Sequence, residues 1–240
     1  MMGAHLGCAL ELGPRLAAVA AMVPLASRVA DVGSDHGKLP TFLLASGQAT
    51  SAFALDVANG PILTLRQGPL PTGLVVRQGD GLAPMVADEV DVVTICGMGG
   101  HTMARVVAQA PAPVWAGLRC GVFQPNDHAA EVRRALLARG WGLGPSTIVW
   151  DRGRWYAVLV GLPPTAGGAR GPFTDAELAW GPGLIARRDP VLASVLRNKV
   201  QRLTAVVAGQ PGAVRAQQQL DRCQALLALP GWPSSSAALG

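Results

Sequence analysis

The chain has 240 residues, of which 50% are hydrophobic and 15% are charged. These proportions exclude an intrinsically disordered chain, and the length allows one large domain or one domain with an appendage. The net charge of +5 is compatible with a nucleic-acid partner but does not by itself indicate one.

Five short apolar runs without polar alternation predict strands that are buried on both faces of a sheet. Stretches long enough for a helix separate these runs, which favours β-α-β units and a parallel, doubly wound α/β sheet. The runs cover residues 28–33, 51–57, 74–80, 91–97 and 120–126.

A helix and a hairpin are expected after the fifth run. Residues 127–140 predict an amphipathic helix that begins at Asp127 as its cap and ends at Gly140. Residues 145–151 and 155–161 predict two further strands, and the three residues between them are too few for a crossover helix. These two strands must therefore form an antiparallel hairpin, which gives a Rossmann-like sheet of seven strands.

The remainder of the chain predicts a small helical appendage. Residues 162–172 have the composition of a linker, a helix opens at Asp189 with Pro190 in its first position, and a second helix follows Gly212. We therefore expect two domains, residues 1–163 and residues 164–240. The appendage carries an excess of basic residues.

The compartment is expected to be the cytoplasm, with reduced thiols. The four cysteines, Cys8, Cys96, Cys120 and Cys223, form no C-x-x-C pair, so neither a zinc site nor a disulfide framework is predicted, and no metal is expected. The first residues lack the features of a signal peptide, and the longest uncharged run, residues 39–55, is too polar for a membrane span.

The segment ADVGSDHGKLP, residues 30–40, follows the first predicted strand and bears on the ligand. A dinucleotide site would need G-x-G-x-x-G, but after Gly33 the second and third glycines are replaced by Asp35 and Lys38. A carboxylate at this point would repel a pyrophosphate. S-adenosylmethionine fits better, because it has no phosphate and carries a net positive charge.

Polar and glycine residues at successive strand ends agree with this ligand. Asp56 ends the second strand, where a carboxylate can accept both ribose hydroxyls, and Asp80 ends the third, where it could bond the adenine amine. The GMGG segment ends the fourth strand, in the crevice where doubly wound sheets bind ligands. The expected cofactor-binding residues are Asp31, Gly33, Gly37, Asp56, Asp80, Gly81, Gly97 and Met98.

Several motifs together resemble a known family. ADVGSDHGKLP, RQGDGL, TICGMGG, QPN, GRWYAVLV and GPGLIARRDPV are similar to segments of bacterial tRNA (adenine(22)-N1)-methyltransferases, and the resemblance runs from about residue 12 to residue 227. It implies a class I methyltransferase domain with a C-terminal, coiled-coil-like helical extension, S-adenosylmethionine as methyl donor, and N1 of an adenine in the D-loop region of tRNA as acceptor. The family usually carries an aromatic residue where this chain has Lys38.

The acceptor chemistry suggests roles for a few residues. Adenine N1 already has a lone pair, so transfer needs alignment rather than deprotonation, and a carboxylate could stabilise the cationic product or take a proton. Asp35 is the first candidate for this role, followed by His36, Gln124 and Asn126, although Asp35 and His36 could instead simply order the loop. Contacts with RNA are expected from Arg15, Lys38, Arg188, Arg197 and Lys199.

Two other readings stay open at this point. The domain could methylate another RNA, a protein or a small molecule, or it could bind RNA without catalysis. The cofactor set argues against the non-catalytic reading, and Asp35 and Lys38 disfavour a nicotinamide oxidoreductase.

Overall fold

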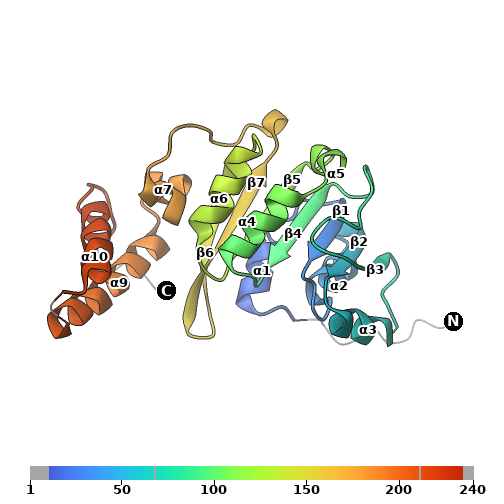
Figure 1. Ribbon diagram of the computed structural model, residues 1–240, viewed down its shortest axis with the longest axis horizontal. Coiled ribbons are helices and arrows are strands. Elements are labelled where there is room, and N and C mark those ends of the chain that lie inside the picture. The colour runs from blue at the N-terminus through green and yellow to red at the C-terminus, as the bar shows by residue number, and fades with distance from the viewer. Residues whose placement is uncertain (1–10, 68, 211, 235–240) are drawn as a thin grey trace.

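The computed structural model describes residues 11–67, 69–210 and 212–234 (Figure 1). Its centre is a seven-strand sheet in the order β3-β2-β1-β4-β5-β7-β6. The first five strands are parallel, and β7 runs antiparallel to both β5 and β6. The strands are β1 (Ser27–Val32), β2 (Ala49–Asp56), β3 (Leu74–Gln78), β4 (Val92–Cys96), β5 (Cys120–Gln124), β6 (Gly142–Asp151) and β7 (Arg154–Leu162). The predicted parallel sheet with a closing hairpin is thus confirmed.

Helices cover both faces of the sheet, and three hydrophobic clusters join them to it. The first helices, α1, α2 and α3, pack on one face, and α4, α5 and α6 pack on the other (Figure 1). None of the helices in the described ranges has the length and apolarity that a membrane span requires. The helices are α1 (Pro14–Ala20), α2 (Lys38–Ala45), α3 (Asn59–Gln67), α4 (Gly100–Gln109), α5 (Ala112–Ala116), α6 (Ala129–Ala138), η1 (Pro164–Ala166), α7 (Asp175–Trp180), α8 (Pro182–Ala186), α9 (Pro190–Gly209) and α10 (Val214–Leu227).

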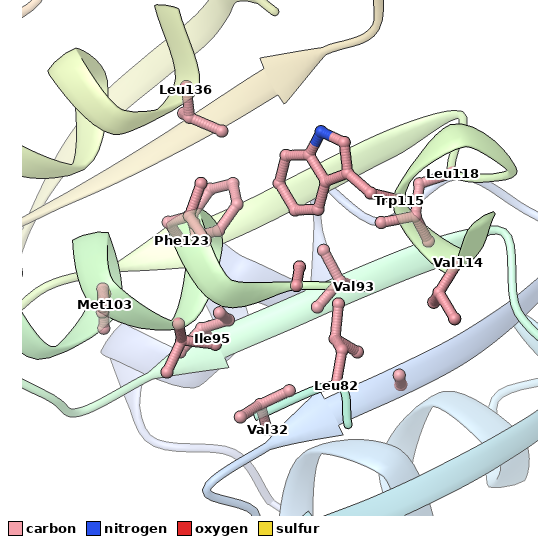
Figure 2. Close-up of a cluster of buried hydrophobic side chains, with 14 of the residues drawn as sticks. Val32, Leu82, Val93, Ile95, Met103, Val114, Trp115, Leu118, Phe123 and Leu136 are labelled. Atoms are coloured by element: carbon pink, nitrogen blue, oxygen red, sulfur yellow. The ribbon is translucent and has the colours of Figure 1, made fainter. Parts of the chain in front are cut away.

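Figure 2 shows the cluster on the second of these faces. Phe123 of β5 and Val93 of β4 pack there with Met103 of α4 and Trp115 of α5, and all four side chains are buried. Because the strands also bury side chains against α1, α2 and α3, their sequences are apolar without alternation. The sheet is therefore a rigid platform, and its carboxyl edge positions the loops described below.

The turn between β5 and α6 corrects one prediction. Asp127 does not cap α6; the helix begins at Ala129 after His128, whose φ is 45°. The Oδ1 atom of Asp127 instead accepts a hydrogen bond from the amide of Gly100, at 3.0 Å, at the start of α4. The first helical amides of α4 have no partner within the helix, and its Gly-Gly start offers no capping side chain, so the neighbouring loop supplies the acceptor.

The C-terminal helices attach to the sheet through the third hydrophobic cluster. Ile148 of β6 is buried there together with Leu184 of α8, Leu192 of α9 and Leu226 of α10. Figure 1 shows α9 and α10 side by side, beyond β6 and at the opposite end of the molecule from β3. The predicted helical appendage is present, and the domain boundary after residue 163 stays a prediction.

Two contacts join the segment between β7 and α8 to the sheet domain. Within the predicted linker, Ala169 exchanges two backbone hydrogen bonds with Leu143, each 2.9 Å long. Arg133 of α6 is 1% exposed, and its Nη1 atom donates to the carbonyls of Leu178 at 2.7 Å and Ala179 at 3.1 Å. Burial lowers the pKa of Arg133 to about 10. The guanidinium thus fastens the end of α7 to α6.

Candidate active site

The backbone amides of the turn after β1 donate hydrogen bonds to carbonyl groups of the protein itself. The amides of Gly33 and Ser34 both donate to the carbonyl of Leu55, at 2.8 and 3.0 Å, and the amide of Gly37 donates to the Ser34 carbonyl at 2.8 Å. A dinucleotide site would direct such amides toward a phosphate. These three amides are already satisfied, which agrees with the predicted absence of a pyrophosphate.

Asp31 is a buried carboxyl group directly beneath this turn. Its side chain accepts a hydrogen bond from Oγ1 of Thr94 at 2.6 Å, since the two residues are neighbours across β1 and β4. Burial raises the pKa of Asp31 to about 6, and the hydroxyls of Thr94 and Ser34 partly oppose this shift. The Ser34 hydroxyl has no hydrogen-bond partner of ordinary geometry in the described part of the chain. A nearby cation would favour the ionised form of Asp31.

Asp56 ends β2 beside the same turn. Its carboxylate accepts hydrogen bonds from the amides of Asp35 at 3.4 Å and Ala58 at 2.8 Å. The charge of Asp56 also contributes to the raised pKa of Asp31. Three carboxyl groups, those of Asp31, Asp35 and Asp56, therefore lie around one strand-to-helix turn.

The turn after β4 is held by two amide side chains from the QPN segment. Oε1 of Gln124 accepts hydrogen bonds from the Gly97 amide, at 3.1 Å, and from Nη1 of Arg15. Nδ2 of Asn126 donates to the Gly97 carbonyl at 2.6 Å, and the Asn126 amide donates to the Met98 carbonyl at 2.8 Å. Gln124 is fully buried, so its role is to support the turn.

A cavity of about 570 Å³ joins these turns. Its volume lies within the range of ordinary small-ligand sites. Eight of the predicted site residues line it: Arg15, Asp31, Gly33, Asp35, His36, Lys38, Gly97 and Asn126.

The other predicted cofactor residues lie around this cavity but do not line it. Met98 packs over Gly33, where a β-carbon would overlap the Met98 side chain. Asp80 forms an ion pair of 2.9 Å with Arg105 of α4. Gly37, Asp56 and Gly81 are likewise outside the lining residues.

The residues predicted to contact RNA fall into two groups. Arg15 and Lys38 line the cavity, whereas Arg188 and Arg197 contact the C-terminal segment instead: Arg188 donates to the Pro230 carbonyl at 2.9 Å, and Arg197 donates to the Pro233 carbonyl. Lys199 lines a second cavity near α9.

Tyr156 and Asp151 also line the cavity and were not among the predicted site residues. Tyr156 lies at the start of β7, with the guanidinium of Arg15 5.6 Å from its ring centre, and Asp151 lies 3.9 Å from Arg15. The second hairpin strand, β7, pairs antiparallel with β5, so it starts at the carboxyl edge of the parallel strands. The predicted hairpin did not specify which of its strands pairs with β5, and this pairing is what places Tyr156 at the site.

The residues present fit S-adenosylmethionine. Its sulfonium and ammonium groups suit a site with the buried Asp31 and the exposed Asp35, and the satisfied amides of the turn suit a ligand without a diphosphate. Among the described residues, no group of three or more His, Cys, Asp and Glu side chains is placed to hold a metal ion.

Comparison with known proteins decides the family. A family model described as a methyltransferase domain matches residues 12–159. The chain is 34% identical, over 183 residues, to the tRNA (adenine(22)-N(1))-methyltransferase of Bacillus subtilis, and the match covers 70% of this chain and 76% of the relative. The chain belongs to the tRNA (adenine(22)-N1)-methyltransferase family. The predicted resemblance is thereby confirmed.

Solved structures that resemble this chain share nearly the whole fold. A Streptococcus pneumoniae protein assigned as a tRNA (m1A22) methyltransferase, in complex with S-adenosyl-L-methionine, is 26% identical with a TM-score of 0.77, and the match covers 89% of this chain and 98% of that one. The m1A22 tRNA methyltransferase of B. subtilis is 27% identical with a TM-score of 0.74, and the match covers 91% and 96%. A Streptococcus agalactiae structure reaches a TM-score of 0.79 at 29% identity, over 90% and 97%. The likeness therefore includes the helical extension.

Proposed function

We propose that this chain transfers the methyl group of S-adenosylmethionine to N1 of an adenine in tRNA, at position 22 in the D-loop region. The observation that carries the cofactor assignment is the buried Asp31 beneath a turn whose amides are satisfied internally. Family membership supports the choice of acceptor.

The chain's residues have three tasks in this reaction. When bound, S-adenosylmethionine supplies an electrophilic methyl carbon on a positively charged sulfur. Asp31 and Asp56 hold the cofactor by charge and by hydrogen bonds, and Asn126 acts as a positioning residue because it fixes the Gly97 turn. The adenine nitrogen needs no prior deprotonation, so alignment of the two reacting atoms is the main requirement.

Among the site residues, Asp35 and His36 are proposed to contact the target adenine. They are exposed at the cavity, and Oδ2 of Asp35 lies 3.5 Å from Nε2 of His36. Methylation at N1 makes the base cationic, and the Asp35 carboxylate would stabilise that charge or accept a proton from the exocyclic amine. His36 would orient this carboxylate.

We also propose that residues 164–240 form the tRNA-binding extension and that the protein acts in the cytoplasm. The excess of basic residues in the last helices supports the extension's role. Arg15 and Lys38 would contact RNA phosphates at the cavity.

Methyl transfer to unmodified tRNA transcripts tests the proposed function. A transcript with adenosine 22 should be methylated, and a matched transcript with guanosine 22 should not. Methylation at N1 blocks base pairing, so reverse transcription should stop at that position. A stop at another adenosine would refute the proposed position of methylation. Absence of S-adenosylmethionine binding in calorimetry would refute the proposed methyl transfer.

A further inference from the structure

A second cavity of about 670 Å³ lies between the sheet domain and the helical extension. The hairpin of β6 and β7 forms one wall, α7 and α9 form the other, and the loop from Pro125 to Ala129 closes one end. We call this second cavity the hairpin groove. Nothing in the chemistry proposed above uses it.

The hairpin groove is lined by aromatic rings. Trp150 and Trp155 are paired across the hairpin, with ring centres 4.8 Å apart, and Trp150 is 49% exposed. On the opposite wall, Nζ of Lys199 lies 5.3 Å from the ring centre of Trp180. An exposed tryptophan held by a neighbouring ring is a ready platform for stacking another flat group.

The charge of the hairpin groove is mainly positive. Arg154, Lys199 and Arg202 line it, against a single carboxylate, Asp127. That carboxylate already accepts the Gly100 amide and lies 3.0 Å from Nδ1 of His128. A groove that combines cations with exposed aromatic rings is the usual pattern of a site for single-stranded nucleic acid.

The hairpin groove adjoins the candidate active site. Asn126 and Tyr156 line both cavities. Successive residues of a strand point to opposite faces, so Trp155 faces the extension while Tyr156 faces Arg15 and the cofactor cavity. Asn126 and Tyr156 therefore lie at the boundary between the two cavities, which we call the rim.

We propose that the hairpin groove binds the tRNA strand next to the target adenosine, and that the adenine crosses the rim and stacks on Tyr156. The flanking base stacks on Trp150, and Lys199 and Arg202 bind its phosphates. This proposal rests on the proposed function for its substrate. It explains how a base can leave its stack, since its neighbours are held on the other side of the rim.

Two single substitutions, each with a matched variant, test the hairpin groove in the full chain. Arg202→Gln removes a groove cation, and Arg119→Gln removes an exposed cation before β5, outside the groove and outside the extension. Trp150→Ala removes the stacking platform, and Trp150→Phe keeps an aromatic ring. The binding of a tRNA transcript is measured without S-adenosylmethionine at several salt concentrations, followed by kcat and KM for methylation.

The groove variants should weaken tRNA binding selectively. Trp150→Ala should raise the Kd for tRNA roughly 5- to 150-fold, and Trp150→Phe should restore most of the loss. Arg202→Gln should lower the slope of log Kd against log salt by about 0.7 to 0.9, with little change for Arg119→Gln. The affinity for S-adenosylmethionine should stay unchanged in all four.

The outcomes separate this proposal from the proposed function. If the wild-type chain methylates tRNA and the groove variants bind tRNA as well as Arg119→Gln does, the groove proposal is overturned and the proposed function stands. A wild-type chain that methylates no tRNA overturns the function, while a selective loss of RNA binding in the groove variants would still support the groove. A wild-type chain that binds no tRNA overturns the groove as well.

Discussion

Asp31 makes the folded protein less stable as the pH rises, and this cost can be measured. Burial raises its pKa from 3.8 to about 6, so between these values the folded chain holds a proton that the unfolded chain has lost. The free energy of unfolding therefore falls as the pH rises from about 4 to 6, and above pH 6 the full loss is about 3 kcal/mol. At pH 5 about half of this loss has already occurred.

Replacement of Asp31 by Asn removes the titration and keeps the shape of the side chain. The amide oxygen can still accept the hydrogen bond that Thr94 donates to Asp31 at 2.6 Å. We expect the free energy of unfolding of Asp31→Asn, relative to the wild type, to increase by about 1.4 kcal/mol between pH 5 and pH 8. The same variant should bind S-adenosylmethionine at least about 10-fold more weakly, because it lacks the charge.

Urea unfolding at pH 5, 6, 7 and 8 measures the stability difference, and calorimetry measures the affinity for S-adenosylmethionine. Asp35→Asn is the matched control, because Asp35 belongs to the same turn but its side chain is 69% exposed. The change with pH should be larger for Asp31→Asn than for Asp35→Asn. If the stability difference between Asp31→Asn and the wild type stayed flat over this pH range, the reasoning from burial would be refuted.

Three further predictions concern the cofactor, a helix start and an ion pair. The affinity of the wild type for S-adenosylmethionine should rise about 10-fold from pH 5 to pH 7 as Asp31 ionises, measured by calorimetry. Gly100→Ala should destabilise the fold by more than about 2 kcal/mol in urea, because its β-carbon would overlap the backbone carbonyl of His128. Glu89→Gln should cost about 1 kcal/mol at pH 7, since Arg77 lowers the pKa of Glu89 to about 2; this stability is present above pH 4.5 and is lost toward pH 2.

Matched variants sharpen these three tests. Asp31→Asn should remove the pH dependence of cofactor binding. Gly209→Ala, in a helix with open space around the new methyl group, should be neutral or slightly stabilising. For the ion pair, Glu89→Gln and the wild type should converge in stability near pH 2, and a constant difference down to that pH would contradict the role of Arg77.

The fold could be predicted because its signals are local. The five parallel strands are buried on both faces, so each appears as an uninterrupted apolar run, and a three-residue connection permits only a hairpin. The predicted cap at Asp127 was wrong because the acceptor serves another helix, whose start lies beside it only in the folded chain. Contacts between elements that are distant in the chain cannot be predicted from the local sequence.

The candidate site could be predicted in part, for a similar reason. Asp31, Asp35 and Gly97 follow or end strands, and strand ends of a parallel sheet meet at one edge. The partners of Arg188 and Arg197 lie in the last residues of the chain, and no sequence spacing indicates that contact. The hairpin groove depends on how the extension packs against β6, which tertiary structure alone determines.

The buried guanidinium of Arg133 has a consequence for substrate choice. By holding the end of α7, it joins α6 to the segment that leads into the C-terminal helices. If those helices bind tRNA as we propose, this joint would help to set the distance between the bound tRNA and the methyl donor. Selection of the modified position would then depend on that distance.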